Sequence, residues 1–399
     1  MSEENSLLSE ISLTKRDTLL FIAYAINPHS GSESGGGWAL LQTYLNSGFY
    51  VYIICGYESE FAIQQELKSY PERFEVLQVK NLRFFNRFLN FLPFGLQLKS
   101  LFWNLSILFD WKSLLNPLQF NFVHYATFAG DWNFCAPLFK RKIPLLWGPI
   151  GGTQKVPIKL FKNLGFIGGL SEVLRFVITF PFRFINKLLV LNHSNIKILC
   201  LNDATQKYFR SSKSEYPLVT NVVLPCLTQS LSWSDKSSNY YFAAGRLIPL
   251  KNWGLAIKSL ALVGDGSLLI IAGTGIHQRS LKKLANSLNI QDRIIFLGQV
   301  THDECIDLML SSKGIVFPSL RDSASWFLAE AAHYGAPIVT LDTPGSRSVS
   351  YFSQFDLVPI SSGHIVKRFS EHMINPSIPL KTGQFCKCKM EKIFSTFVP

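Results

Sequence analysis

The sequence predicts an α/β protein of two doubly wound domains that face each other across a cleft. The chain has 399 residues, which is too long for one ordinary hydrophobic core. Short β-branched or aromatic runs alternate with longer helix-compatible stretches, as in βα units that build parallel sheets. Hydrophobic residues make up 47% of the chain and charged residues 17%, which is enough for two cores and argues against global disorder.

The first domain is expected over residues 1–228. Its first strand is predicted at 18–26, followed by the turn-rich stretch NPHSGSESGGG and a helix from about Trp38. Further strands are predicted in YVYIICG, NFVHYA, IPLLWGPIGG and IKILCLN. The glycines ahead of the helix predict a loop in which the backbone approaches a ligand closely. These glycines are Gly35, Gly36 and Gly37. A second glycine loop is expected at 148–152, at the end of a strand.

Residues 229–238 lack apolar periodicity and are predicted to be a linker. The second domain is expected at 239–375, and 376–399 would form a C-terminal tail. Its predicted strands are YYFAAGRL, SLLIIAGTG, RIIFLGQV, GIVFPS and APIVTLDTPG, with helices near 252–263, 277–288, 302–311 and in SWFLAEAAHYG. Ligands of doubly wound sheets bind outside the carboxyl ends of the strands, so functional residues are expected there.

Positive charge is concentrated in residues 80–187, which hold 14 Lys and Arg residues, three acids and 18 of the 33 Phe residues. Basic residues interleaved with Phe and Leu suit an anionic membrane surface, because apolar groups enter the acyl boundary while the cations stay at the headgroups. Core helices with solvated basic faces are an equally supported alternative. Nucleic-acid contact is a third and less favoured reading.

The chain shows no apolar run long enough to span a bilayer, and its first residues are polar and acidic without a secretory signal. Seven scattered cysteines, an odd number, argue against a disulfide framework. Cys386 and Cys388 are interpreted as free thiols, since two thiols do not complete a metal site. Together these features favour a cytoplasmic location, with peripheral attachment to the inner face of the membrane as an option.

The segment 318–339 predicts a strand, a short loop and a helix that Gly335 closes as its C-cap. Unpaired backbone N–H groups and the positive helix end at its start favour an anion, above all a phosphate. The residues expected to contribute these groups include Ser323, Ala324, Ser325 and Trp326. Asp322 precedes the helix and Glu330 lies about two turns inside, where they could accept hydrogen bonds from a sugar and a ribose. The alternatives are a helix cap for Asp322 and a buried structural acid for Glu330.

Two cations follow a buried strand in AAGRLIPLKNW, where Arg246 and Lys251 could converge on a diphosphate. Solvated loop cations are the alternative. His124 ends the strand NFVHYA, where its side chain would project into the cleft or serve a structural role.

The sequence lacks HExxH, GxSxG, CxxC and DxD, and its glycine loops match neither the GxGxxG nor the GxxxxGK[ST] pattern. A nicotinamide fold and a P-loop are therefore disfavoured. We expect no cofactor and no obligatory metal.

Read together, GRLIPLKNW, IIAGTG, RIIFLGQV, FPSLRDSASWFLAEAAHYGAPIV and TPGS resemble the successive signatures of the GT-B glycosyltransferases of group 1, also called family 4. The resemblance runs over roughly residues 18–350. GSESGGGW and HYATFAGDW, with LLWGPIGG, are similar to a bacterial branch of that family. It implies two Rossmann-like domains, a nucleotide-sugar donor held mainly by the second, and transfer with retention of configuration to a glycan or lipid-linked acceptor.

The resemblance also implies roles for individual residues. Arg246 and Lys251 match the positions that neutralise the diphosphate. Asp322 and Glu330 match the two acids that meet the donor sugar and the ribose. His124 matches a residue lining the sugar site. Two glycines complete the implied donor site: Gly275 in IIAGTG and Gly298, which precedes the segment that contacts the base.

Three departures from the family pattern stand out. The first acid is Asp322 where Glu is commoner, RSV follows DTPGS where an acid is usual, and the chain beyond 350 is shorter and less patterned than the usual closing helix. These departures support the alternative that the protein is an inactive or weakly active GT-B scaffold that binds a membrane or a partner. A sugar-nucleotide hydrolase or epimerase is a further alternative.

Overall fold

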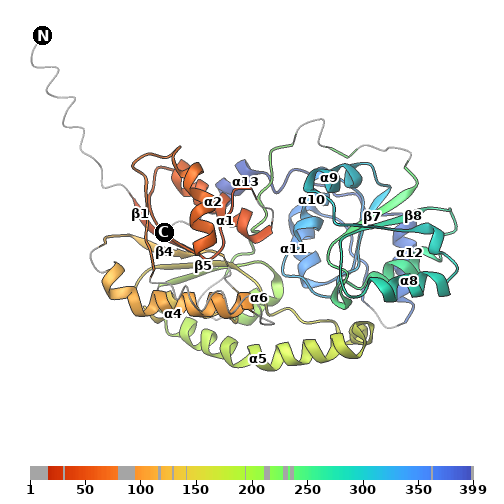
Figure 1. The fold of residues 1–399 in the computed structure, drawn as a ribbon, viewed down its shortest axis with the longest axis horizontal. Helices are drawn as coiled ribbons and strands as arrows, with labels where there is room; N and C mark the ends of the chain where they lie inside the picture. Colours follow the sequence, from red (N-terminus) through yellow and green to blue (C-terminus); the bar gives the residue numbers. More distant parts are fainter. Residues whose placement is uncertain are drawn as a thin grey trace, which may run out of the picture.

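A computed structural model describes residues 17–29, 32–79, 95–115, 118–127, 130–140, 142–193, 195–210, 216–227, 232–233, 238–360 and 363–396. Within these ranges the chain folds into two α/β domains, each built around a parallel sheet, as predicted (Figure 1). The basic and Phe-rich residues 80–94 lie outside the described residues.

The first domain has its described strands in the order β3-β2-β1-β4-β5-β6. β1 lies centrally, and Leu19 to Ala23 have no exposed surface, as expected for a parallel strand covered on both faces. The strands are β1 (Thr18–Ala23), β2 (Tyr50–Cys55), β3 (Phe74–Val76), β4 (Phe122–Tyr125), β5 (Leu145–Ile150) and β6 (Ile196–Cys200). The helices are α1 (Ser32–Asn46), α2 (Tyr57–Leu67), α4 (Gly95–Leu115), α5 (Gly165–Leu191) and α6 (Asp203–Phe209), with the 3-10 helices η1 (Ala136–Phe139) and η2 (Ile158–Leu164). All the predicted strands of this domain are present, and among its described strands only the three-residue β3 was not predicted.

The second domain has its strands in the order β11-β10-β7-β8-β9. They are β7 (Tyr240–Ala244), β8 (Leu268–Ala272), β9 (Ile294–Gly298), β10 (Gly314–Phe317) and β11 (Ile338–Thr340). The helices are α7 (Trp253–Leu260), α8 (Gln278–Ser287), α9 (His302–Leu310), α10 (Trp326–Tyr334), α11 (Pro344–Ser353) and α12 (Ile365–Ile374), with the 3-10 helices η4 (Pro249–Lys251) and η5 (Gln291–Arg293). Each predicted strand and helix of this domain is confirmed. The sequence pattern succeeded because Gly, Pro or a polar loop follows each strand.

Two helices connect the domains. α13 (Lys387–Ser395) returns to the first domain, where Met390 is buried in the core that also holds β1. The weakly patterned tail therefore does form a closing helix. α5 belongs to the first domain and runs along one side of the molecule (Figure 1). Its first turns contact η4 of the second domain. Just before α5, Asn163 of η2 donates a hydrogen bond to Asn252 at 3.3 Å.

Candidate functional site

A cavity of about 560 Å³ lies between the two domains, at the carboxyl ends of both sheets. The second domain lines it with the residues that follow β7 and with the loop between β10 and α10. The first domain contributes Glu33 of α1, the loop after β4 and the glycine loop after β5. The cavity therefore lies at the strand ends, where the functional residues are predicted.

The start of α10 forms one wall of the cavity. Ser323, Ala324, Ser325 and Trp326 all line it. Ser325 is the N-cap, with extended backbone and a side-chain oxygen that accepts from the Leu328 N–H at 3.3 Å. Gly335 ends the helix in the left-handed conformation, as predicted. The cap is thus Ser325 and not Asp322. The positive end of α10 points at the cavity, where it would stabilise an anion.

Lys251 lies beside this turn. Its ammonium nitrogen is 2.8 Å from a carboxylate oxygen of Asp322 and 4.8 Å from the ring centre of Phe317. Asp322 also accepts a hydrogen bond from Ser319 at 2.7 Å. The two loops are joined through their backbones, because the Leu320 N–H donates to the Leu250 carbonyl at 3.0 Å. The backbone therefore fixes Lys251 next to the start of α10.

Two arginines add positive charge to the same cavity. Arg321 precedes Asp322, and Arg175 reaches the cavity from α5. Glu172 of α5 lies between them, 2.9 Å from Arg321 and 3.1 Å from Arg175. Burial and the neighbouring Arg321 lower the pKa of Arg175, although Glu172 opposes them. The two partly buried guanidinium groups share one carboxylate, so positive charge exceeds negative charge on this wall of the cavity, while Glu33 places a carboxylate on the α1 side. An anionic ligand at the wall formed by the arginines would neutralise that charge.

The turn at Ser323 also joins the two domains. Gln154 donates to the Ser323 hydroxyl at 2.6 Å, and Asn202 donates to the Ser323 carbonyl at 2.9 Å. Gly151 faces the same residue so closely that a Cβ on Gly151 would lie 2.7 Å from the Ser323 side chain. The glycine loop predicted at 148–152 therefore allows the first domain to approach the start of α10.

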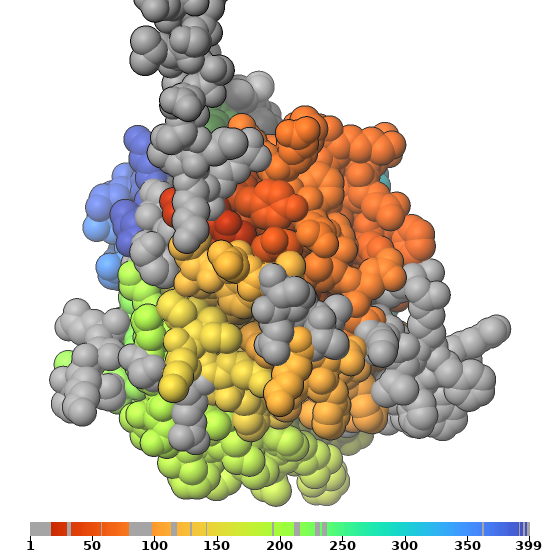
Figure 2. All heavy atoms as spheres, turned by 90° about the vertical axis from the view of Figure 1, so that its left-hand side faces the viewer, coloured from red at the N-terminus to blue at the C-terminus, as the bar shows by residue number. Residues whose placement is uncertain are grey.

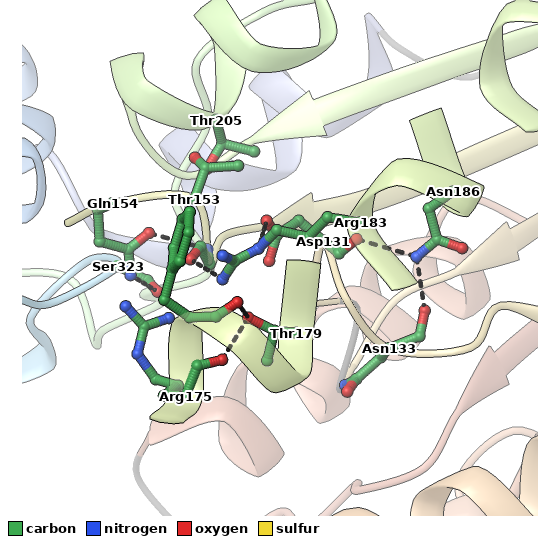
Figure 3. A network of polar contacts seen from close by, with 12 residues as sticks. Asp131, Asn133, Thr153, Gln154, Arg175, Thr179, Arg183, Asn186, Thr205 and Ser323 are labelled. Carbon is green, nitrogen blue, oxygen red and sulfur yellow. Dashed lines mark hydrogen bonds and ion pairs between the residues drawn. The ribbon is translucent and has the colours of Figure 1, made fainter. Parts of the chain in front are cut away.

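A polar network behind the cavity fixes the first-domain loops to α5 (Figure 3). Arg183 pairs with Asp131 at 2.6 Å and donates to the Gly152 carbonyl at 2.7 Å. Asn186 donates to the carbonyls of Asp131 and Asn133, both at 2.9 Å. Burial raises the pKa of Asp131 to about 6, against the opposing effect of Arg183. The buried face of α5 is thus polar and shapes the cavity wall.

The prediction that His124 projects into the cleft is wrong. His124 lies on β4 with no exposed surface and is not among the cavity residues. Its two ring nitrogens are bonded within the core, to the Tyr44 hydroxyl and to the Gly148 carbonyl, both at 2.8 Å. Burial lowers its pKa to about 4, so the ring is neutral near pH 7. His124 is therefore a structural residue of the core, which was the alternative interpretation of this position.

The predicted glycine loop at Gly35, Gly36 and Gly37 is also wrong, because all three lie inside α1, which begins at Ser32 and not near Trp38. A Cβ on Gly36 would lie 2.4 Å from the Asn221 carbonyl oxygen, and one on Gly37 would lie 2.7 Å from the Ala25 carbonyl oxygen. The close approach is therefore to the protein's own backbone and not to a ligand. Glu33, one turn earlier, is the α1 residue that lines the cavity.

Gly275 and Gly298 do not line the cavity in this structure. A Cβ on Gly275 would lie 2.4 Å from the Leu247 carbonyl oxygen, so this glycine allows close packing of two loops. Gly298 ends β9 with a φ of 77°, and open space surrounds the position of its missing Cβ. A donor role for Gly298 stays a prediction.

Arg246 and Glu330 are two further predicted site residues that do not line the cavity. Arg246 is exposed, next to the lining residue Gly245, and its carbonyl accepts from the Trp253 indole at 3.1 Å. Glu330 is buried, and one of its oxygens accepts from Trp326 at 2.9 Å and bonds His302 at 2.7 Å. Glu330 thus supports Trp326, which does line the cavity. Direct contacts of Arg246 and Glu330 with a donor stay predictions.

Several cavity residues were not predicted, because only the fold brings them together: Glu33, Gln154, Arg175, Asn221 and Arg321. Arg321 could have been predicted from the sequence, because it directly precedes Asp322 in the segment 318–339. Arg347 occupies the position where an acid was expected, and pairs with Asp342 at 2.8 Å and with Asp203 of the first domain at 3.2 Å. This departure therefore adds an ion pair between the domains.

Comparisons with known proteins agree with this geometry. Residues 232–351 match the family model described as Glycosyl transferases group 1. The O-antigen chain mannosyltransferase RfbU of Salmonella typhimurium is 24% identical over 166 residues, which cover 41% of this chain and 46% of RfbU. The chain thus aligns with less than half of the length of this curated relative.

Two solved structures match nearly the whole chain. Sucrose-phosphate synthase of Thermosynechococcus elongatus has a TM-score of 0.61 at 14% identity and covers 96% of this chain and 98% of its own. HepE of Anabaena, solved with UDP and glucose, has a TM-score of 0.55 at 12% identity and covers 96% and 99%. At this identity they show the fold alone. The chain therefore has the GT-B fold of two Rossmann-like domains, and its residues 232–351 match the group 1 glycosyltransferases.

Proposed function

We propose that this protein is a retaining glycosyltransferase of family 4 that moves a sugar from a nucleoside diphosphate sugar to a hydroxyl of a glycan or lipid-linked acceptor. One observation carries the proposal: Lys251 and the first turn of α10 lie side by side in a cavity between two Rossmann-like domains. The similarity to an O-antigen mannosyltransferase supports a role in cell-surface polysaccharide or glycolipid synthesis.

Stabilisation of the leaving group would dominate catalysis. Negative charge that develops on the departing diphosphate would be met by Lys251, the N–H groups at the start of α10 and the nearby Arg321. These groups are fixed by backbone contacts before the donor arrives, so little reorganisation is needed during the reaction. Arg246 is exposed and directly follows the lining residue Gly245, and we assign it to the same diphosphate.

The acceptor hydroxyl would attack from the face that the diphosphate leaves, which gives retention without a covalent enzyme intermediate. Asp322 is engaged by Lys251 and Ser319, so we assign it to donor sugar hydroxyls and not to nucleophilic attack. The contacts of Ser323 with Gln154 and Asn202 would help exclude water while the domains are closed, which limits donor hydrolysis.

A panel of UDP-, GDP- and ADP-sugars tests the proposal through thermal unfolding, since a ligand of the folded state raises the midpoint. We expect one nucleotide class to raise it and to support transfer only with an acceptor. Product formed without acceptor would instead indicate a hydrolase or epimerase. No stabilisation by any donor at millimolar concentration would favour the inactive scaffold.

We further propose that α5 attaches the enzyme to an anionic membrane surface. Its polar residues face the protein: Arg183, Asn186 and Thr179 are buried. Its apolar residues face outward, including Phe166, Ile167, Leu170, Leu174, Val177 and Phe184, all at least half exposed. Figure 2 shows α5, in yellow-green, at the lower edge of the molecule. Such an inverted pattern suits a helix that lies in the plane of a membrane interface.

Charge next to this face favours anionic lipid over another apolar surface. Lys155, Lys159 and Lys162 are exposed just before α5, and Ile158 and Phe161 lie exposed between them. Lysines beside inserted apolar groups are the pattern that anionic headgroups attract. None of the helices in the described part of the chain is long and apolar enough to cross a bilayer. Attachment would therefore be peripheral, and we place it on the inner face of the cell membrane.

Vesicle sedimentation tests the attachment. We expect binding to vesicles with anionic lipid that weakens as salt rises, and loss of at least about tenfold in affinity for Ile167→Asp with Leu174→Asp. Leu262→Asp is the control, because Leu262 is an exposed apolar residue of the second domain. Equal binding by the α5 variant would reject the proposal. A wild-type dimer in light scattering that the α5 variant abolishes would reassign this face to a second copy.

A further inference from the structure

Three cysteines from two distant segments of the chain meet beside the junction of the two domains. The sulfur of Cys388 lies 2.9 Å from that of Cys386 and 3.5 Å from that of Cys226. All three sulfurs lie within 4.8 Å of one another. Over the described residues, this is the one group of three or more His, Cys, Asp or Glu side chains with a geometry that could hold a metal ion. Cys386 and Cys388 are free thiols, as interpreted from the sequence, and a third thiol that the sequence did not reveal lies beside them.

The backbone brings these sulfurs together. The Leu224 N–H donates to the Phe385 carbonyl at 2.8 Å, and the Lys387 N–H donates to the Leu224 carbonyl at 2.9 Å. This short parallel pairing places the segment that ends in Cys226 beside the Cys-Lys-Cys sequence. The meeting of the thiols is thus a property of the fold and not of flexible side chains.

The distances suit coordination by a small thiophilic ion. Two thiolates bound to Zn²⁺ at ~2.3 Å with tetrahedral angles lie about 3.8 Å apart. The separations of 2.9 Å, 3.5 Å and at most 4.8 Å bracket this value, so small side-chain rotations would suffice. Cys388 also lies in the first turn of α13, whose positive end stabilises negative charge on sulfur.

The remaining described cysteines differ in both place and chemistry. Four cysteines lie apart from this group, and burial raises the pKa of each thiol: Cys55, Cys135, Cys200 and Cys305. They are neutral packing residues at physiological pH. Cys226 and Cys388, in contrast, are exposed, while Cys386 is buried against the chain. Water and a metal ion can therefore reach the three-cysteine group.

We propose that Cys226, Cys386 and Cys388 bind one Zn²⁺ through three thiolates, with the fourth position open to water. Binding releases the three thiol protons to solvent. The ion joins the segment that leaves the first domain to the start of α13. Because α13 packs on the first domain through Met390 and Lys387 bonds Gln42 at 2.9 Å, the ion would hold the closing helix in place.

Zinc content of the untagged, fully reduced chain tests the site. We expect about one Zn²⁺ per chain in the wild type and in the control Cys305→Ser. In Cys388→Ser the affinity should fall by at least about 100-fold, since loss of an outer-shell partner alone costs 10- to 100-fold. Cobalt substitution should give a thiolate-to-metal charge-transfer band in the wild type and the control but not in Cys388→Ser.

Cys226→Ser provides a second test of the site if Cys388→Ser does not fold, because Cys226 is exposed and outside the helix. It should also lose zinc. The site is rejected if the reduced wild type retains no zinc after equimolar loading and dialysis, or if both variants retain it like the wild type. A disulfide among these cysteines that persists in the presence of zinc would also reject it.

Discussion

The ammonium group of Lys251 lies 2.8 Å from the Asp322 carboxylate, on the wall of the cavity between the two domains. The carboxylate neutralises the cation that we assign to the diphosphate. Donor binding would therefore exchange one anionic partner of Lys251 for another. Asp322 would then be free to meet the hydroxyl groups of the donor sugar, while Ser319 keeps its loop in place.

Asp322→Asn separates these two roles, since the amide keeps the shape and an acceptor for Ser319 but removes the charge. We expect the nucleoside diphosphate alone to bind about three- to tenfold more tightly, because a competing anion is lost. Transfer should fall, since a neutral amide is a weaker acceptor for sugar hydroxyls. Calorimetry with UDP and GDP, paired with transfer assays, measures both effects. Weaker diphosphate binding in the variant would contradict this account of the ion pair.

Gly151→Ala tests the closure of the two domains. The new methyl group would lie 2.7 Å from the Ser323 side chain, so the first domain must withdraw from the start of α10. We expect turnover to fall by at least about tenfold, because small misplacements of catalytic groups are costly, and donor hydrolysis to rise relative to transfer. Gly254→Ala is the matched control, since its methyl group would meet Leu284 at an ordinary 3.5 Å. Normal transfer by Gly151→Ala would show that Ser323 and Gly151 separate during catalysis.

The pKa of His302 depends on its hydrogen bond with Glu330. A hydrogen bond to Glu330 raises the pKa of His302, against a smaller opposing effect of burial. A raised pKa means that protonated His302 stabilises the fold. This contribution is fully present below the ordinary His pKa of about 6.5 and is lost as pH rises through the folded-state pKa. NMR titration should show a lower His302 pKa in Glu330→Gln than in the wild type. Identical titration curves would show that the pair is not formed in solution.

The fold was predictable because every strand of the second domain is a short apolar run that ends in Gly, Pro or a polar loop. The start of α10 was predictable for a similar reason, with small polar residues before it and Gly335 after it. Lys251 and residues 322–326 are close in sequence to strand ends, so their meeting in one cavity followed from the sheet topology.

The errors have physical causes. β4 is buried on both faces, so its sequence gives no sign of which way His124 points. Three consecutive glycines disfavour a helix by about 1 kcal/mol each. Glycines are nevertheless required in α1, because the Asn221 and Ala25 backbones leave no room for a Cβ at Gly36 and Gly37. The approach of Arg175 to Arg321 and that of Cys226 to Cys388 bring together residues distant in the chain, and a single sequence does not reveal such proximity.

The most direct test of the central claim is transfer and nucleoside diphosphate binding by Lys251→Ala. Lys282→Ala is the control, because Lys282 also lies over a Phe ring of the second domain, 5.8 Å from the centre of Phe296, but does not line the cavity. We predict that Lys251→Ala lowers turnover by about 10²- to 10³-fold, as expected for the loss of one charge-stabilising donor, and weakens diphosphate binding. Near-normal transfer and binding by Lys251→Ala would contradict a diphosphate site at the start of α10.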